Sequence, residues 1–112
     1  LLDCLKVSKI LEQENISVEV IDPRTLSPID RFTIINSVKK TGRLIVVDPG
    51  WVSYGASAEI ITSVIESPDV KMKSKPIRVA LPDSHTPMSQ TLEEEYYINK
   101  KKILSAIRKS LK

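Results

Sequence analysis

An unbroken apolar run at residues 44–47, closed by a proline and a glycine, constrains the fold more than any other feature of this chain. Such a run is too short for a helix, and its lack of polar alternation is typical of a strand buried on both faces. Pro49 cannot donate a ladder hydrogen bond, and Gly50 permits a turn, so the strand should end at residue 48. Gly55 then precedes a segment of helical periodicity. Because ligands and partners meet open α/β sheets at the carboxyl ends of strands, we expect function near residues 49–55.

The flanking segments repeat this alternation of helices and strands. Ser27 is the expected cap of the second helix, with Pro28 at its first position and Asp30 in its first turn. Residues 82–95 show no period and predict a long ordered loop or an arm. Periodicity predicts strands at residues 16–22, 44–48 and 76–81, and helices to about residue 14, over 27–41 and 56–66, and from about residue 99. Right-handed crossovers then predict a mostly parallel sheet between two helical layers, an α/β fold with three layers (α/β/α).

Composition excludes several classes of protein. With 112 residues the chain forms a single domain, and a net charge of +3 with 4% aromatic residues is a poor basis for a nucleic-acid platform. Cys4, the single cysteine, cannot form an intrachain disulfide, which fits a reducing compartment, and we expect it in the core. No apolar run reaches the ~20 residues of a membrane-spanning helix, so no membrane partner is expected.

The start of the chain and the width of the sheet both indicate a missing part. Apolar residues follow a helical stripe from Leu1 onward, with no cap or strand before them. Three strands also make a narrow sheet, since sheets average ~5–6 strands. We therefore expect residues 1–112 to be one domain that is truncated at its amino-terminal end.

Side chains for catalysis or metal binding are scarce. His85 is the single histidine and lies beside Asp83 and Ser84, but the members of a hydrolase triad must converge in space, and neighbours in one loop rarely do. One histidine and one cysteine fall short of a metal site. We therefore predict no catalytic and no metal-binding residues in this chain.

The loop from Gly50 to Gly55 allows two interpretations. It lacks both the P-loop and the dinucleotide glycine patterns, although the helix after Gly55 could offer N–H groups to a small anion. The favoured interpretation is that Gly55 is required for close packing of the loop on the helix. Trp51 and Tyr54 lie in the same loop of a chain poor in aromatics, which indicates either an interface anchor or a packing role.

Five segments in order resemble the C-terminal domain of transketolases, and more closely the beta subunit of thiamine-diphosphate-dependent 2-oxo acid dehydrogenases of the pyruvate, branched-chain or acetoin type. Pro49 and the loop at 84–89 depart from the commonest version of that pattern. The resemblance rests on residues 16–30, 39–48, 50–51, 58–60 and 78–83.

The resemblance implies an assembly role. In such enzymes thiamine diphosphate and magnesium are held by the alpha subunit and the amino-terminal domain of the beta subunit, so no cofactor-binding residue is expected here. The carboxy-terminal domain would contact the alpha subunit and a second beta subunit in a heterotetramer and dock the dihydrolipoyl acyltransferase core. We expect Trp51, Tyr54 and His85 at such an interface. The implied location is the bacterial cytoplasm or the matrix of mitochondria or plastids.

The family fold also implies a strand between residues 16–22 and 44–48, supplied from just upstream of Leu1. Without it, two apolar strand edges would be open, so residues 1–112 alone should be poorly soluble or completed by another segment. Two alternatives remain: a free-standing α/β module that binds an anion at Gly50–Gly55, and the equivalent domain of transketolase or deoxyxylulose-phosphate synthase.

Overall fold

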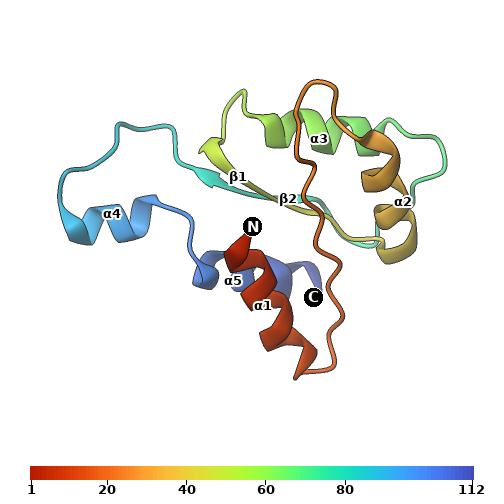
Figure 1. The fold of residues 1–112 in the computed structure, drawn as a ribbon, viewed down its shortest axis with the longest axis horizontal. Coiled ribbons are helices and arrows are strands. Elements are labelled where there is room, and N and C mark those ends of the chain that lie inside the picture. The colour runs from red at the N-terminus through yellow and green to blue at the C-terminus, as the bar shows by residue number, and fades with distance from the viewer.

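The computed structural model describes all 112 residues and shows an α/β fold with a parallel sheet between helices (Figure 1). Strands β1 and β2 pair in parallel, with Ile45 opposite Ile77 and Val47 opposite Val79. The elements are α1 (Leu2–Glu12), α2 (Arg31–Thr41), β1 (Ile45–Trp51), α3 (Ala56–Ile65), β2 (Ile77–Leu81), α4 (Gln90–Tyr96) and α5 (Lys100–Ser110).

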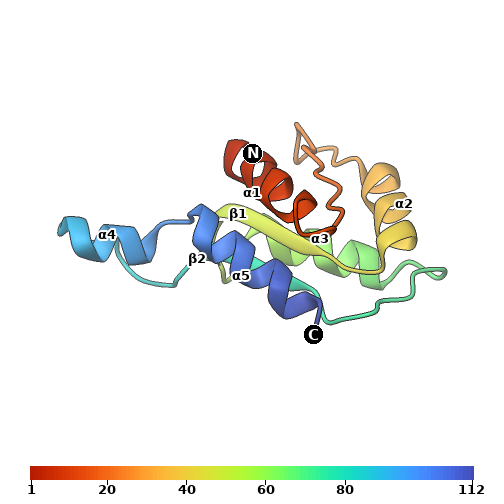
Figure 2. The same ribbon diagram turned by 90° about the horizontal axis from the view of Figure 1, so that it is seen from below.

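Helices cover both faces of the sheet, as the predicted three layers require. Figures 1 and 2 show α1 and α5 on one face, with α2 and α3 on the other. The first pair packs on the sheet through a cluster of six buried residues, Val7, Leu11, Val79, Ile103, Ala106 and Ile107. The second pair buries Ile34, Val38 and Val64. Ile45, Val47, Ile77 and Val79 of the two strands pack on the first core, whereas Leu44, just before β1, packs on the second.

The sheet is narrower than predicted, because residues 16–22 do not form a strand. They run as an extended segment, and β1 pairs with β2 alone. The expectation of a three-stranded sheet was therefore wrong for this chain. The physical reason is that an apolar, β-branched segment becomes a strand only when a neighbouring backbone completes its hydrogen bonds.

Strand β1 continues past the proline that was expected to end it. The register shifts between Val47 and Trp51, and the N–H of Val52 still donates to the carbonyl of Leu81 at 2.8 Å. An irregularity of this kind lets Pro49 lie in the strand without a ladder hydrogen bond. The bend carries Trp51 to the tip of the sheet.

Most helix ends follow the sequence signals, with one correction. Gly42 closes α2 at φ 75°, and the side chain of Asn99 caps α5 by accepting from Lys102 N–H. However, α2 begins at Arg31, and its cap is Asp30 rather than Ser27. The Asp30 carboxylate accepts from the N–H of Thr33 at 3.1 Å and from its hydroxyl at 2.6 Å.

Residues 82–99 form an arm that extends away from the sheet and the helices that cover it, and this arm contains α4 (Figure 1). The arm was predicted, but its helix was not. Helix α4 has seven residues, and Tyr96 alone among them is buried, so it carries no apolar stripe to detect. No helix of the structure has both the length and the apolar composition that crossing a membrane requires.

Candidate subunit-contact site at the β1–α3 loop

Asp48 organises the loop between β1 and α3. Its Oδ1 accepts a hydrogen bond from the N–H of Gly50 at 2.9 Å, and its Oδ2 accepts one from the N–H of Ser57 at 3.0 Å. A carboxylate held beside the first turn of a helix also complements the positive end of the helix dipole. The chain thus supplies its own negative group to the amino-terminal end of α3, which disfavours the predicted anion site.

Gly55 is present because the backbone passes too close for any side chain. A Cβ atom added there would lie 2.5 Å from the carbonyl oxygen of Trp51 and 3.0 Å from Oδ2 of Asp48. The φ of Gly55 is −82°, which other residues adopt freely, so its conformation does not require glycine. The packing interpretation of this glycine is therefore supported.

A second set of hydrogen bonds joins the loop to the arm. The indole N–H of Trp51 donates to the hydroxyl of Tyr96 at 3.0 Å, and this hydroxyl donates to the carbonyl of Ser84 at 3.1 Å. Tyr96 is only 5% exposed, whereas Trp51 remains 57% exposed. Trp51 therefore holds the base of the arm with its polar edge while much of its ring faces solvent.

Asp83 and Arg78 fasten the remaining part of the loop. The Asp83 carboxylate accepts from the N–H of Ser53 at 3.2 Å and from its hydroxyl, and Arg78 donates to the carbonyl of Val52 at 2.6 Å. The loop is thus anchored on both sides of Tyr54. Such anchoring reduces the entropy that a contact residue loses on binding.

Tyr54 lies at the tip of this anchored loop with its side chain fully exposed. Its backbone has φ 58°, a left-handed conformation that is uncommon for a residue other than glycine. On the neighbouring arm, Met88 and Leu92 are also exposed. Tyr54 on the loop and Met88 and Leu92 on the arm are therefore large apolar side chains that the core of this chain does not bury.

The structure places the other predicted interface residue, His85, on the arm. His85 is exposed and makes no hydrogen bond within the chain, while Asp83 is engaged by Ser53. The three neighbours Asp83, Ser84 and His85 thus form no hydrogen-bonded relay. His85 thus lies on the arm itself, whereas Trp51 ends β1 and Tyr54 lies in the loop that follows; of these two, Trp51 is the one that is hydrogen-bonded to the arm.

Sequence reasoning missed Tyr96 and the role of Asp48. Tyr96 carries no pattern signal, because its partner Trp51 lies 45 positions away along the chain. Asp48 had a local signal, an acidic residue at a strand end just before a helix. Its two acceptor bonds depend on the turn that brings Ser57 back to it.

Residues 1–103 match the family described as "Transketolase, C-terminal domain". The pyruvate dehydrogenase E1 component subunit beta of Acholeplasma laidlawii is 44% identical over 96% of this chain. The subunit of the same name from Bacillus subtilis (strain 168) is 39% identical over 97% of this chain, and the mitochondrial one from Homo sapiens is 37% identical over 96%.

The chain spans about a third of the length of these relatives, which it covers to 32%, 33% and 30%. A solved structure titled "Split gene transketolase, inactive beta4 tetramer" superposes with a TM-score of 0.80 at 25% identity. That match covers 97% of this chain and 34% of the other.

Proposed function

Because this chain belongs to the transketolase C-terminal domain family, we propose that it is the carboxy-terminal assembly domain of the beta subunit of a 2-oxo acid dehydrogenase. The pyruvate type is favoured, since the matched relatives are named as pyruvate dehydrogenase E1 beta subunits. The parent enzyme would decarboxylate the 2-oxo acid oxidatively and pass the acyl group to a lipoyl group. The relative from Homo sapiens is named as mitochondrial. We propose that this chain is located in the matrix of mitochondria or plastids or in a bacterial cytoplasm.

The exposed aromatic tip of the β1–α3 loop carries this proposal. Tyr54 gains nothing from its own chain, yet the loop beneath it is held by Asp48, Asp83 and Arg78. Exposed aromatic residues on a rigid support are typical anchors of protein–protein interfaces. We propose that this surface contacts the alpha subunit or the second beta subunit of a heterotetramer. The acyltransferase core would dock elsewhere on the same domain.

Thiamine diphosphate and magnesium belong to the parent enzyme in this proposal. The residues here do not fit a diphosphate–magnesium site, because no three acidic, histidine or cysteine side chains converge. The N–H of Ser57 at the start of α3, one of the groups that could face a phosphate, already donates to Asp48. We therefore assign this domain no part in holding either group.

The two alternatives receive less support. An anion-binding module would need free N–H groups at α3, where Asp48 already accepts. A transketolase assignment rests on a structural neighbour at 25% identity, against 37–44% for the three dehydrogenase subunits.

The proposal is tested by Tyr54→Ala in the full beta subunit, produced together with the alpha subunit. Truncating an aromatic anchor of an interface costs about 1–2 kcal/mol, so we expect the dissociation constant of the assembly to rise by about 5- to 30-fold. The measurement is sedimentation velocity over a dilution series. Because Tyr54 is fully exposed, thermal unfolding of the separated beta subunit should not change.

Phe32→Ala is the matched control. Phe32 is also an exposed aromatic, at 77%, but it lies on α2 and outside the contact surface. Equal dissociation constants for the Tyr54 variant and the parent would contradict the proposal. An equal weakening by both variants would also contradict it, because the effect would then not be local to the loop.

A further inference from the structure

Three exposed lysines occupy alternate positions in the segment that joins α3 to β2. Lys71, Lys73 and Lys75 are exposed, whereas Met72 and Ser74 between them are partly buried. Met72 packs on the core between α2 and α3, which holds this segment against the body of the domain. The three ammonium groups therefore lie together on the solvent side of the segment.

Backbone hydrogen bonds fix this segment to the turn between α2 and β1. The N–H of Lys73 donates to the carbonyl of Gly42 at 2.7 Å, and the N–H of Ile77 donates to the carbonyl of Leu44 at 3.1 Å. The side-chain stem of Lys73 also packs on Gly42, where its Cγ lies 2.8 Å from the position that a Cβ would occupy. The lysines are thus carried by an anchored backbone, which reduces the entropy that is lost when a partner binds.

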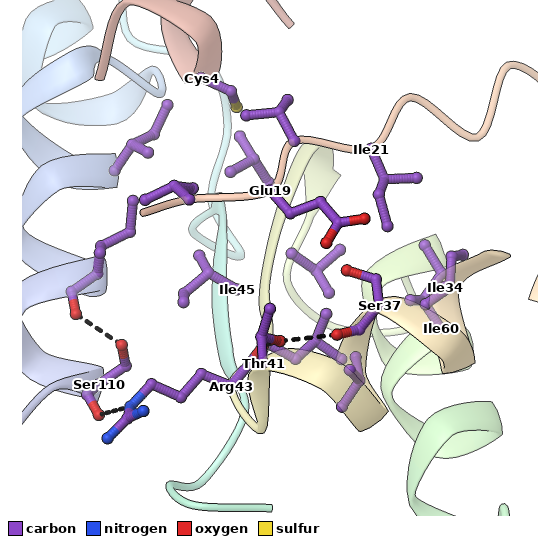
Figure 3. A pocket seen from close by; sticks show the side chains of 18 of the residues that line it. Cys4, Glu19, Ile21, Ile34, Ser37, Thr41, Arg43, Ile45, Ile60 and Ser110 are labelled. Carbon is purple, nitrogen blue, oxygen red and sulfur yellow. Dashed lines mark hydrogen bonds between the residues drawn. The ribbon is translucent and has the colours of Figure 1, made fainter. Parts of the chain in front are cut away.

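Arg43 adds a fourth cation at the same edge of the sheet. It lies between α2 and β1, and its Nε donates to the carbonyl of Ser110 at 3.0 Å (Figure 3). This hydrogen bond brings the end of α5, with the exposed Lys109, alongside the edge. The surface lies where both strands begin, at the opposite end of the sheet from the β1–α3 loop and the arm (Figure 1). This cationic edge comprises Arg43, Lys71, Lys73 and Lys75.

No acidic side chain of the chain forms an ion pair with the cationic edge. Asp69, two positions before Lys71, approaches Lys39 instead, at 3.9 Å. Like charges that are gathered without counter-charges create a positive potential, and such a potential attracts an anionic partner. The ion pairs within the chain engage four other cations, Arg31, Lys39, Lys40 and Arg108.

We propose that the cationic edge binds an acidic, carboxylate-rich segment of another protein. Nucleic acid is a less suitable partner, because every aromatic residue of the chain lies outside this edge and bases would find no surface to stack on. Lysine clusters that bind membranes adjoin a spanning helix or lie on an amphipathic helix, whereas this segment joins a short helix to a strand. Arg43, the single arginine of the edge, is half-buried and bonded to Ser110, so it offers no free guanidinium for bidentate recognition of phosphate.

Ammonium groups on flexible stems suit a partner of this kind. Each lysine is a mobile point charge that requires no fixed geometry, so carboxylates spaced along an extended chain can meet successive lysines. Exposed charge pairs act mainly on the rate of association, and salt screens them. The inference does not depend on which partner the β1–α3 loop contacts, because the two surfaces lie at opposite ends of the sheet (Figure 1).

The test measures the binding of a synthetic decaglutamate peptide to the full-length beta subunit at low salt, by isothermal titration calorimetry. The triple variant Lys71→Glu/Lys73→Glu/Lys75→Glu replaces three attractive contacts by repulsive ones. We expect it to raise the dissociation constant at least about tenfold. Binding to the unaltered protein should weaken as the salt concentration rises.

The matched control is Lys6→Glu/Lys9→Glu/Lys101→Glu, which makes the same change of net charge at exposed lysines of α1 and α5. We expect the control to change the dissociation constant less than about threefold. A milder variant, Lys71→Gln/Lys75→Gln, leaves Lys73 and its packing on Gly42 intact. It should raise the dissociation constant about threefold without a change in thermal unfolding.

Absence of binding to decaglutamate at low salt would overturn the proposal. Equal weakening by the edge variant and the control would also overturn it, because net charge alone would then account for the binding. Tighter binding of oligothymidine or of phosphatidylserine vesicles through the same three lysines would assign the edge to a different polyanion, against the proposal. These measurements require no alpha subunit, so their failure is distinct from failure of the proposed assembly role.

Discussion

Gly55→Ala is the most direct test of how the candidate site is built. The new methyl group would lie 2.5 Å from the Trp51 carbonyl oxygen, a backbone atom that cannot rotate away. It would also lie 3.0 Å from Oδ2 of Asp48, the atom that accepts from Ser57 N–H. The loop must therefore move away from α3, and the carboxylate that caps this helix must move with it.

The cost follows from these contacts. Overpacking a tight site costs about 1–3 kcal/mol, and loss of a helix cap costs about 1 kcal/mol. The unfolded state of the alanine variant is less flexible, which returns about 0.4–1 kcal/mol. We expect a net loss of about 2 kcal/mol in the opening free energy of the first turn of α3, a factor of about 30 in its opening equilibrium.

The assay is hydrogen exchange of Ser57 N–H in the full beta subunit, where the variant should exchange about 30-fold faster. Gly50→Ala is the matched control, because neither glycine has a positive φ. The nearest atom to a Cβ at Gly50 is Oδ1 of Asp48, at 3.2 Å, a side-chain atom that can shift slightly. We expect less than about a threefold change for that variant.

The reasoning would be refuted if the two variants changed Ser57 exchange equally, since the contact with Trp51 would then have no specific cost. It would also be refuted if Gly55→Ala left the exchange rate unchanged. Either result would mean that the loop can move without disturbing the cap.

Two further predictions concern the arm and the cap of α2. Trp51→Phe keeps an aromatic ring but removes the hydrogen bond to Tyr96, which is worth about 1 kcal/mol. Hydrogen exchange in α4 should therefore accelerate about fivefold, while exchange in β2 stays constant. Unchanged exchange in α4 would contradict this prediction. The Thr33 hydroxyl and N–H bonds lower the pKa of Asp30 below its ordinary value of 3.8. The stabilisation that the Asp30 carboxylate provides is therefore present above the pKa that this group has in the unfolded chain. It is lost as the pH falls through the lower pKa of the folded chain. Asp30→Asn should weaken the decline in stability below about pH 4, measured by urea unfolding, and an identical acid limb would refute the assignment.

Much of the fold was predictable because its signals are local. Gly42 and Asn99 mark helix ends whose hydrogen bonds form within four residues, so the structure confirms both. Strand β2 likewise follows from an apolar run after a proline. The cap of α2 was predicted at the wrong residue because Ser27 and Asp30 both carry suitable oxygens. Only the position of Thr33 decides between them.

For the candidate site, the sequence pointed to the loop after β1 but not to its construction. Trp51 and Tyr54 stood out as rare aromatics after an apolar run. Whether each ring is buried, exposed or hydrogen-bonded depends on the path of the arm, and Tyr96 reaches Trp51 only because the arm folds back toward the sheet.

By itself the sequence determined the alternation of helices and strands and the family. Only the tertiary structure decided that residues 16–22 remain unpaired, that β1 extends beyond Pro49, and that Asp48 occupies the start of α3. The physical reason is the range of each interaction. Periodicity and capping act between neighbours along the chain, whereas strand pairing and loop anchoring join backbones that meet only after the helices have packed.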